Sequence, residues 1–184
     1  MSCTSLISAA INPNCPATPK GFEQDASIYN KADIETVVYD VTTGLVTSII
    51  MKSGKKGYPV TIRGTQPFKE FKVTGEQKNY GMMFKGEVSI IVLGNTPNAA
   101  ATVNVLTKGE FVLLLTQKGV SDSSKYPIIG IESGLIADSA SLEPYGDNGG
   151  WIVPMSESMR EAAGLFVWIT DLATTNALIA ATLD

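Results

Sequence analysis

The side chains that could perform chemistry in this chain are carboxylates, lysines, serines and tyrosines, because none of its 184 residues is a histidine. Without an imidazole, Ser-His-Asp and Cys-His nucleophilic catalysis, histidine-based zinc sites and imidazole proton transfer are excluded. An enzyme built from this sequence would have to use carboxylates or lysine.

Two short motifs resemble known catalytic or metal-binding sequences. Ser53-Gly-Lys-Lys56 matches SxxK, but it lies in a predicted Gly-rich turn, whereas serine acyl-enzymes place SxxK at the start of a helix beside further motifs. Gly146-Asp-Asn-Gly-Gly150 could offer oxygens to calcium, yet it lacks the spacing and the distal glutamate of an EF-hand loop. We predict that both are ordinary turns.

The acidic residues of the C-terminal third do not form a recognisable catalytic pair. Glu157, Glu161 and Asp171 are well separated in the sequence, and nothing indicates that they form the two carboxylates of a glycosidase. The chain also has no GxGxxG and no Walker A motif. We therefore predict that this protein is not an enzyme and that it has no cofactor and no metal site.

The composition points to a protein that buries part of its surface against something else. Hydrophobic residues make up 44% of the chain and charged residues 17%, against a usual charged share of about 25%. We expect self-assembly, the alternative being a monomer whose surface is rich in Ser, Thr and Asn. With a net charge of −4, the chain lacks the basic surface of a protein that binds duplex nucleic acid. A mildly acidic surface would let nucleic acid pass without binding it.

The N-terminal region contains both cysteines, Cys3 and Cys15. A bridge between them is one state that the sequence allows, and two free thiols in a reducing cytoplasm is the state that we expect. Met1 to Ile11 has no basic region and is not expected to be a targeting signal. No apolar stretch reaches 18 residues, so we expect no membrane partner.

The elements that would position any site are mostly β-strands. Residues 1–30 contain several prolines and are predicted to be an extended N-terminal arm that packs on its own domain or on a neighbour. Residues 34–41 and 45–52 are predicted to form a hairpin, and Pro59 makes the strand at 58–63 short or an edge strand. Further strands are expected at 68–74, 80–84, 87–93, 110–117, 126–131, 135–142, 151–155 and 165–169.

One helix is well marked, at about 96–108. Thr96 is a good N-cap, Pro97 suits the first helical position, and Gly109 is placed as a C-terminal cap. The stripe that would pack on a sheet comprises Ala99, Val103 and Leu106. A helical turn at 156–163 and a short helix at 174–182 are also expected. Together these elements predict a single mainly β domain over residues 1–184, a β-sandwich or barrel with one flanking α-helix.

The order of these elements resembles a known family. An extended N-terminal arm, hairpins with a protruding turn and the capped helix at 96–108 leading into the strand at 110–117 are similar to the tail-tube proteins of tailed bacteriophages, particularly those of Bacteroides-type hosts. The resemblance continues through residues 126–131 (YPIIGI), 146–151 (GDNGGW) and 166–171 (FVWITD), and it covers most of the chain.

The resemblance implies a virion structural protein, made in the host cytoplasm, that assembles into rings, commonly hexameric. The rings would stack into a hollow tail tube, through which DNA passes during ejection, and other tail proteins would be its partners. Two alternatives stay open: another virion component, such as a head–tail connector, tail terminator or capsid-decorating protein, or a small β-barrel that binds an apolar ligand. The side chains expected to line such a barrel are Tyr39, Phe111, Phe166 and Trp168.

Joints between copies would form on exposed strand edges and hydrophobic side chains. The candidates for the assembly interface are Phe68, Phe71, Tyr80, Met82, Met83 and Phe84. Contacts between stacked rings are expected in the loops at 53–57 and 141–151, with Lys55, Lys56, Tyr145, Asp147 and Asn148 as the candidate residues. Ordinary core positions and free surface turns are the alternative interpretation of these two sets.

Overall fold

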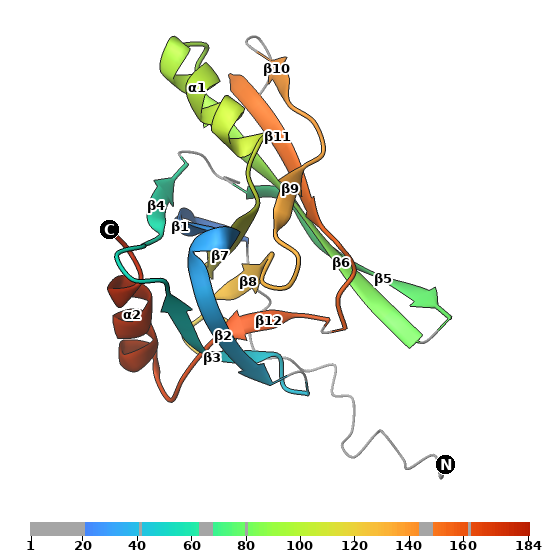
Figure 1. The fold of residues 1–184 in the computed structure, drawn as a ribbon, viewed down its shortest axis with the longest axis vertical. Coiled ribbons are helices and arrows are strands. Elements are labelled where there is room, and N and C mark those ends of the chain that lie inside the picture. The colour runs from blue at the N-terminus through green and yellow to red at the C-terminus, as the bar shows by residue number, and fades with distance from the viewer. Residues whose placement is uncertain (1–20, 41, 63–67, 80, 144–148, 162) are drawn as a thin grey trace.

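The computed structural model describes residues 21–40, 42–62, 68–79, 81–143, 149–161 and 163–184 (Figure 1). Its strands are β1 (Phe22–Asn30), β2 (Ile34–Asp40), β3 (Leu45–Met51), β4 (Tyr58–Thr61), β5 (Phe68–Lys78), β6 (Gly81–Leu93), β7 (Phe111–Gln117), β8 (Pro127–Ile129), β9 (Leu135–Ala137), β10 (Ser141–Glu143), β11 (Gly150–Glu157) and β12 (Leu165–Val167). A 3-10 turn, η1 (Lys31–Asp33), and two helices, α1 (Pro97–Leu106) and α2 (Leu172–Ala181), complete the elements. The prediction of a mainly β fold with a flanking helix is confirmed.

All strands of the described residues belong to one hydrogen-bonded sheet. The order of its main path is β2-β3-β12-β8-β7-β9-β11-β6-β5, and β1 and β4 branch from β7. Among the described residues, the two strands at the ends of this path have one neighbour each: β2 pairs with β3, and β5 pairs with β6. In the described part of the sheet, both ends of the main path are therefore open edges, and the branch strand β4 and the short β10 also have one strand neighbour each.

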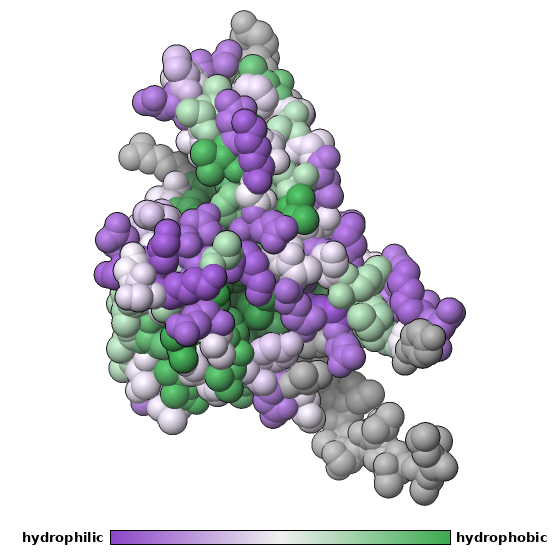
Figure 2. Space-filling model, in the orientation of Figure 1, coloured by the Kyte–Doolittle hydropathy of each residue, from purple (hydrophilic) through white to green (hydrophobic). Residues whose placement is uncertain are grey.

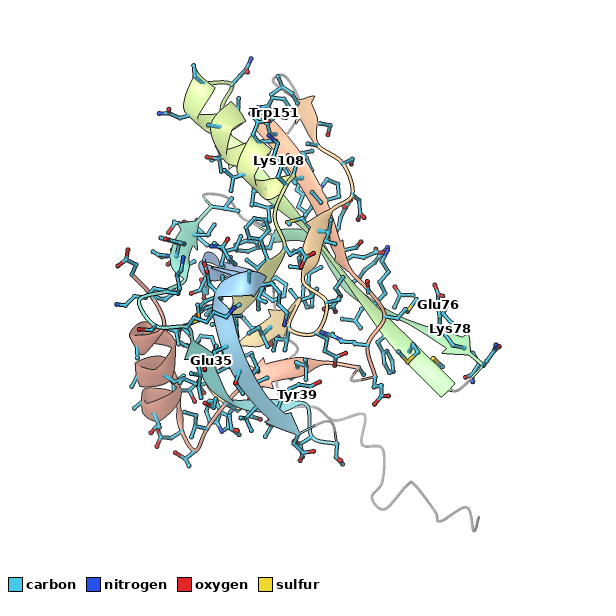
Figure 3. The ribbon with its side chains drawn as sticks, viewed as in Figure 1. Glu35, Tyr39, Glu76, Lys78, Lys108 and Trp151 are labelled. Atoms are coloured by element: carbon cyan, nitrogen blue, oxygen red, sulfur yellow. The ribbon has the colours of Figure 1, made fainter. Side chains whose placement is uncertain are left out.

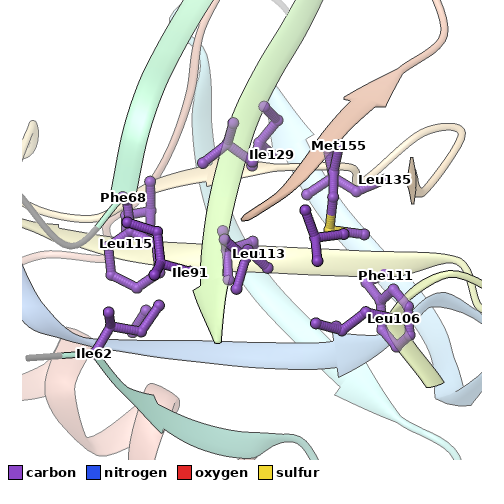
Figure 4. Close-up of a cluster of buried hydrophobic side chains, with 14 of the residues drawn as sticks. Ile62, Phe68, Ile91, Leu106, Phe111, Leu113, Leu115, Ile129, Leu135 and Met155 are labelled. Atoms are coloured by element: carbon purple, nitrogen blue, oxygen red, sulfur yellow. The ribbon is translucent and has the colours of Figure 1, made fainter. Parts of the chain in front are cut away.

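Strand β7 lies between two hydrophobic cores. Its residues from Phe111 to Leu115 are all buried, as expected for a strand covered on both faces. Phe111, Leu113 and Leu115 point into the first core, which Figure 4 shows, together with residues of β6, β11 and α1. Val112 and Leu114 point into the second core, which β3, β8 and β12 complete. The alternation of side chains along one strand thus separates the two cores.

Helix α1 begins and packs as its sequence predicts. The Thr96 hydroxyl accepts a hydrogen bond from the Ala99 amide, and Pro97 follows at the first helical position. The buried residues of α1 are Ala99, Val103 and Leu106, the predicted stripe. The predicted role of Gly109 as helix cap is wrong, because the helix already ends at Thr107 in a right-handed conformation. Gly109 instead makes room for a ring: a Cβ there would lie 2.4 Å from Phe111 Cζ.

The segment 22–30, predicted to be part of an irregular arm, is a regular strand. β1 pairs with β4 on one side and with β7 on the other, and Tyr29 is fully buried. The Pro and Gly residues before residue 22 hid this strand, and its exposed Gln24 and Asp25 interrupt the apolar pattern. Residues 1–20, the rest of the predicted arm, lie outside the described residues.

Other predictions need smaller corrections. The strands expected at 80–84 and 87–93 form one strand, β6, from Gly81 to Leu93. The helical turn expected at 156–163 is not found in the described part of that segment, where β11 runs to Glu157. Helix α2 confirms the expected C-terminal helix, and its N-cap is Asp171, which accepts from the Thr174 amide at 2.8 Å. Neither helix of the described residues has the length and apolarity needed to cross a membrane.

Candidate assembly surface

The outer half of the β5–β6 hairpin projects from the body of the protein, on the right of Figure 1. We call this part, residues 72–78 of β5 and 81–87 of β6, the arm. Its two strands pair in regular register from Lys72 opposite Glu87 to Lys78 opposite Gly81. In contrast, a bulge lies just below the arm, where Glu70 adopts a φ of 58° and the register shifts. The bulge marks the point where β5 changes from body to arm.

One face of the arm is charged. Cross-strand partners share a face, and on this face Lys72 Nζ lies 2.7 Å from Glu87 Oε2, and Lys85 Nζ lies 3.2 Å from Glu87 Oε1. Hydrogen bonding to Lys72 lowers the pKa of the Glu87 carboxyl below its ordinary value. Nearer the tip, Lys78 pairs with Glu76 at 2.6 Å, and Figure 3 labels both residues. This face is suited to contact with water.

The opposite face of the arm is apolar and uncharged. It carries Val73, Gly75, Met82 and Phe84, with Gln77 near the tip as its polar member, opposite Met82. Gly75 lies opposite Phe84, and a Cβ on Gly75 would lie 3.1 Å from the Phe84 ring and 3.2 Å from Met82 Sδ. Val73 keeps 36% of its surface exposed and Met82 keeps 50%. Figure 2 shows green hydrophobic residues on the arm directly beside purple hydrophilic ones.

This apolar face continues the side of β6 that faces the first core. Side chains two residues apart on a strand point the same way, and Val88 and Ile90, on the same side as Met82 and Phe84, are 1% and 3% exposed. Between them, Gly86 leaves room for the Ile129 side chain, 2.5 Å from where a Cβ would be. The side of β6 that is covered in the body therefore loses its cover toward the tip of the arm: Gly86 is buried, Phe84 is half-buried and Met82 is exposed.

A buried ion pair holds the base of the arm. Arg160 Nη1 lies 2.9 Å from Glu157 Oε1, and the two side chains are 2% and 1% exposed. The Gly130 amide donates to the other carboxylate oxygen at 2.8 Å. The backbone of Arg160 exchanges two hydrogen bonds of 2.8 Å with Phe84. Burial raises the pKa of the Glu157 carboxyl above its ordinary value, although the guanidinium beside it favours the charged form.

A second uncharged face lies at the other end of the strand order, on the β2–β3 hairpin. Thr36 is opposite Ile50 and Val38 is opposite Ser48, so these four side chains share one face. Val38 is 50% exposed and Ile50 is 47% exposed, whereas Ile49, on the other face, is buried in the second core. We call these four residues the β2–β3 face.

The predicted interface residues fall into three environments. Phe68 is 4% exposed, and the rings of Phe71 and Phe22 pack edge to face with their centroids 5.0 Å apart. Both Phe68 and Phe71 therefore belong to the body of this copy. Met82 and Phe84 lie on the apolar face of the arm, whereas Met83 lies opposite Glu76 on the charged face. Tyr80 lies outside the described residues.

The predicted stacking loops are only partly described. Lys55 and Lys56 are exposed in the turn between β3 and β4, which lies on the side of the body away from the arm in Figure 1. Lys55 Nζ is 3.5 Å from Asp33 Oδ1. Tyr145, Asp147 and Asn148 lie outside the described residues.

The residues predicted to line a ligand cavity are not brought together. An apolar groove of about 450 Å³ is lined by β1, β4, β6 and α1, and Phe111 is the one member of the predicted set that lines it. The Tyr39 hydroxyl donates to Glu132 at 2.8 Å, in another shallow hollow. The acidic residues also stay apart: Glu157 is in the buried pair, and Asp171 caps α2. Among the described residues, no three acidic or cysteine side chains gather as a metal site.

Comparison with known proteins gives no relative: no family model, no curated protein and no solved structure matches this chain. The candidate surface therefore rests on geometry alone. Its most informative residues, Val73, Val38 and Ile50, were missed at the level of sequence. The alternation Lys72, Thr74, Glu76, Lys78 against Val73, Gly75, Gln77 is the signal that could have found the arm.

Proposed function

We propose that this protein is a structural subunit that assembles head to tail with copies of itself into rings, which stack into a hollow tube. The observation that carries the proposal is the arm, on which the core-facing side of β6 continues beyond the body without a cover. Exposure of an apolar strand face to water is unfavourable. Burying it against another copy contributes roughly 25 cal/mol for each Å² of apolar surface removed from water.

The β2–β3 face is the surface proposed to receive the arm of the next copy. Both faces lack charge, and both expose aliphatic side chains: Val73 and Met82 on the arm, Val38 and Ile50 on the hairpin. The two faces differ from each other, so their contact is heterologous and repeats around a ring or along a filament. A self-complementary contact would stop at a dimer.

The open edges of β2 and β5 support the same arrangement. Each strand has one strand neighbour among the described residues, and backbone groups along a free edge can pair with a strand of another copy. Lys72 and Lys78 of β5 lie on the charged face of the arm, which stays in water when the apolar face is covered. Bulges in β2 and at the base of β5 limit edge pairing to the regular stretches, of which residues 72–78 are the longer.

Within our proposal, the assembly is a virion tail tube, and DNA passes through its lumen. The net charge of −4 per chain agrees with a lumen that does not bind the phosphate backbone. A head–tail connector, tail terminator or capsid-decorating protein would use the same surfaces but form one closed ring or a decoration.

The test is electron microscopy of the purified protein over a concentration series, with the mass in solution measured in parallel. Rings or tubes with a central hole are expected, and their images give the symmetry. Stacked tubes favour the tail tube, and single closed rings favour a connector or terminator. A 19.5 kDa monomer at every concentration overturns the proposal.

A further inference from the structure

The apolar groove between the β1–β4 pair and the β6–α1 unit lies away from the arm, between β4 and α1 in Figure 1. Tyr58 and Val60 line one wall, and Val92, Val105 and Leu106 line the other. Eight large hydrophobic side chains are well exposed among the described residues, and three of them, Tyr58, Leu93 and Val105, line this groove. Three of the eight exposed hydrophobic side chains thus gather in one concave site.

The polar side chains in the groove offer little to a ligand with a polar head group. Asn30 and Thr61 already donate to neighbouring aspartates, at 2.9 and 2.7 Å, and Thr102 donates to a carbonyl of its own helix at 3.0 Å. Specific small-molecule sites usually hold a few convergent polar groups that orient the ligand. A row of aliphatic side chains from a polypeptide needs no such anchor.

The chain itself contains a segment with the matching chemistry. Residues 1–19 have no charged side chain, and Leu6 to Ile11 (LISAAI) is mostly aliphatic. We propose that the apolar run Leu6–Ile11 of one copy binds in the groove of a second copy. This inference rests on the proposed self-assembly and adds a joint that is separate from the arm.

The direction of β1 favours a second copy as the receiver. The described chain begins at Gly21, whose carbonyl accepts from the Lys118 amide at 2.9 Å, and β1 then runs toward the groove, which it lines with its last residues. Gly21, where the described chain begins, is therefore at the end of β1 that is farther from the groove. Pro13, Pro16 and Pro19 recur at every third position, a spacing that favours an extended polyproline-type spacer of about 3.1 Å per residue.

Cysteine cross-linking of the full chain tests this joint, because Cys3 and Cys15 flank the apolar run. Thr102→Cys adds a thiol in the groove, and Ala101→Cys adds one on the preceding residue of α1, which is exposed but does not line the groove. Each variant is treated with a short bifunctional maleimide at a concentration where assemblies form. A third variant combines Thr102→Cys with Cys3→Ser and Cys15→Ser.

A ladder of covalent multimers is expected for Thr102→Cys, well above the level of the unsubstituted chain, and it should disappear in the variant without native cysteines. Adding Leu6→Asp should also abolish the ladder, whereas Thr18→Asp, outside the apolar run, should leave it. Equal ladders from Thr102→Cys and Ala101→Cys overturn the joint, and so does a cross-link within one chain. Assemblies without the Thr102-specific ladder overturn this inference alone, whereas a chain that stays monomeric overturns the proposed self-assembly as well.

Discussion

The Tyr29 hydroxyl lies 3.0 Å from Thr182 Oγ1, a buried contact between residues 153 positions apart. The Thr182 hydroxyl has a single proton, which it donates to the Ile179 carbonyl at 2.7 Å, so Tyr29 is the donor in this pair. Beside it, the Gly57 amide donates to the Thr182 carbonyl, and a Cβ on Gly57 would lie 2.3 Å from the Tyr29 ring. This contact fixes the C-terminal end of α2 to the body.

We predict that Tyr29→Phe lowers the free energy of unfolding by about 1 kcal/mol, the usual net contribution of a buried hydrogen bond. The ring still fills its site, so the fold is kept. Tyr58→Phe is the matched control, because Tyr58 is 53% exposed and should be neutral. Urea unfolding at one pH measures both variants, and equal effects would show that the Tyr29 contact contributes nothing.

The arm joint can be tested with neighbouring residues of one strand. Val73 and Thr74 are both exposed, but they point to the apolar and the charged face of the arm. Val73→Asp is expected to abolish rings and tubes, because it places a charge in the arm joint, whereas Thr74→Asp should assemble like the unsubstituted chain. Mass in solution and electron microscopy measure both, and unfolding curves show that each variant is folded.

Mixing variants tests whether the joint is heterologous. Val38→Asp damages the β2–β3 face. In this experiment both variants also carry Leu6→Asp, which removes the groove joint, so each variant alone is expected to remain monomeric. A mixture of Val73→Asp and Val38→Asp chains retains one intact joint per pair, since the second variant keeps its arm and the first keeps its β2–β3 face. The expected product is a one-to-one dimer that cannot extend. A mixture that remains monomeric would remove the β2–β3 face from the joint.

The buried pair at the base of the arm predicts a pH-dependent variant. Arg160→Met leaves the Glu157 carboxylate buried without its partner, which typically costs about 3–5 kcal/mol. Without the guanidinium, the pKa of Glu157 in the folded state should rise further above the value of about 4.3 expected for the unfolded chain. The folded state then binds the proton of Glu157 more tightly than the unfolded state does. The stability of Arg160→Met therefore falls as pH rises from the unfolded pKa of Glu157 through its raised folded pKa.

Stability curves at several pH values between about 5 and 7.5 would show this effect. Arg160→Met should be less destabilised at the acidic end. Adding Glu157→Gln, which removes the charge but keeps an acceptor for the Gly130 amide, should restore much of the stability and remove the pH dependence. A pH-independent loss in the single variant would show that Arg160 acts through packing.

Local signals in the sequence predicted the elements that depend on local chemistry. Thr96 and Pro97 define the start of α1, and Pro59 correctly predicts an edge strand, since β4 pairs with β1 alone among the described residues. β1 was missed because its burial comes from its two neighbours: β7 and β4 lie more than 25 residues away, and no local pattern reports them.

The candidate surface was predicted only in part, for a related reason. Phe68 and Met82 are similarly hydrophobic, but Phe68 lies opposite Ile90 in the body, whereas Met82 lies in the arm. The difference depends on where the body ends along the hairpin, which a tertiary contact, the Arg160 bridge to Phe84, determines. The bulge at Glu70 also obscured the alternation of β5. Even-numbered residues before the bulge and odd-numbered residues after it lie on the same face of the sheet.

The N-cap of α2 gives a final prediction, on acid stability. Hydrogen bonding from the Thr174 amide lowers the pKa of the Asp171 carboxyl below its ordinary value. The unfolded carboxyl has a pKa of about 3.9, so the stabilisation is present above that pH and is lost as pH falls through the folded value. Asp171→Asn keeps the acceptor without the charge. The difference in Tm between the natural chain and Asp171→Asn should therefore shrink between pH about 5 and about 2.5, while Asp171→Ala stays below the Asn variant throughout. A constant difference would show that the carboxylate charge does not contribute to the cap.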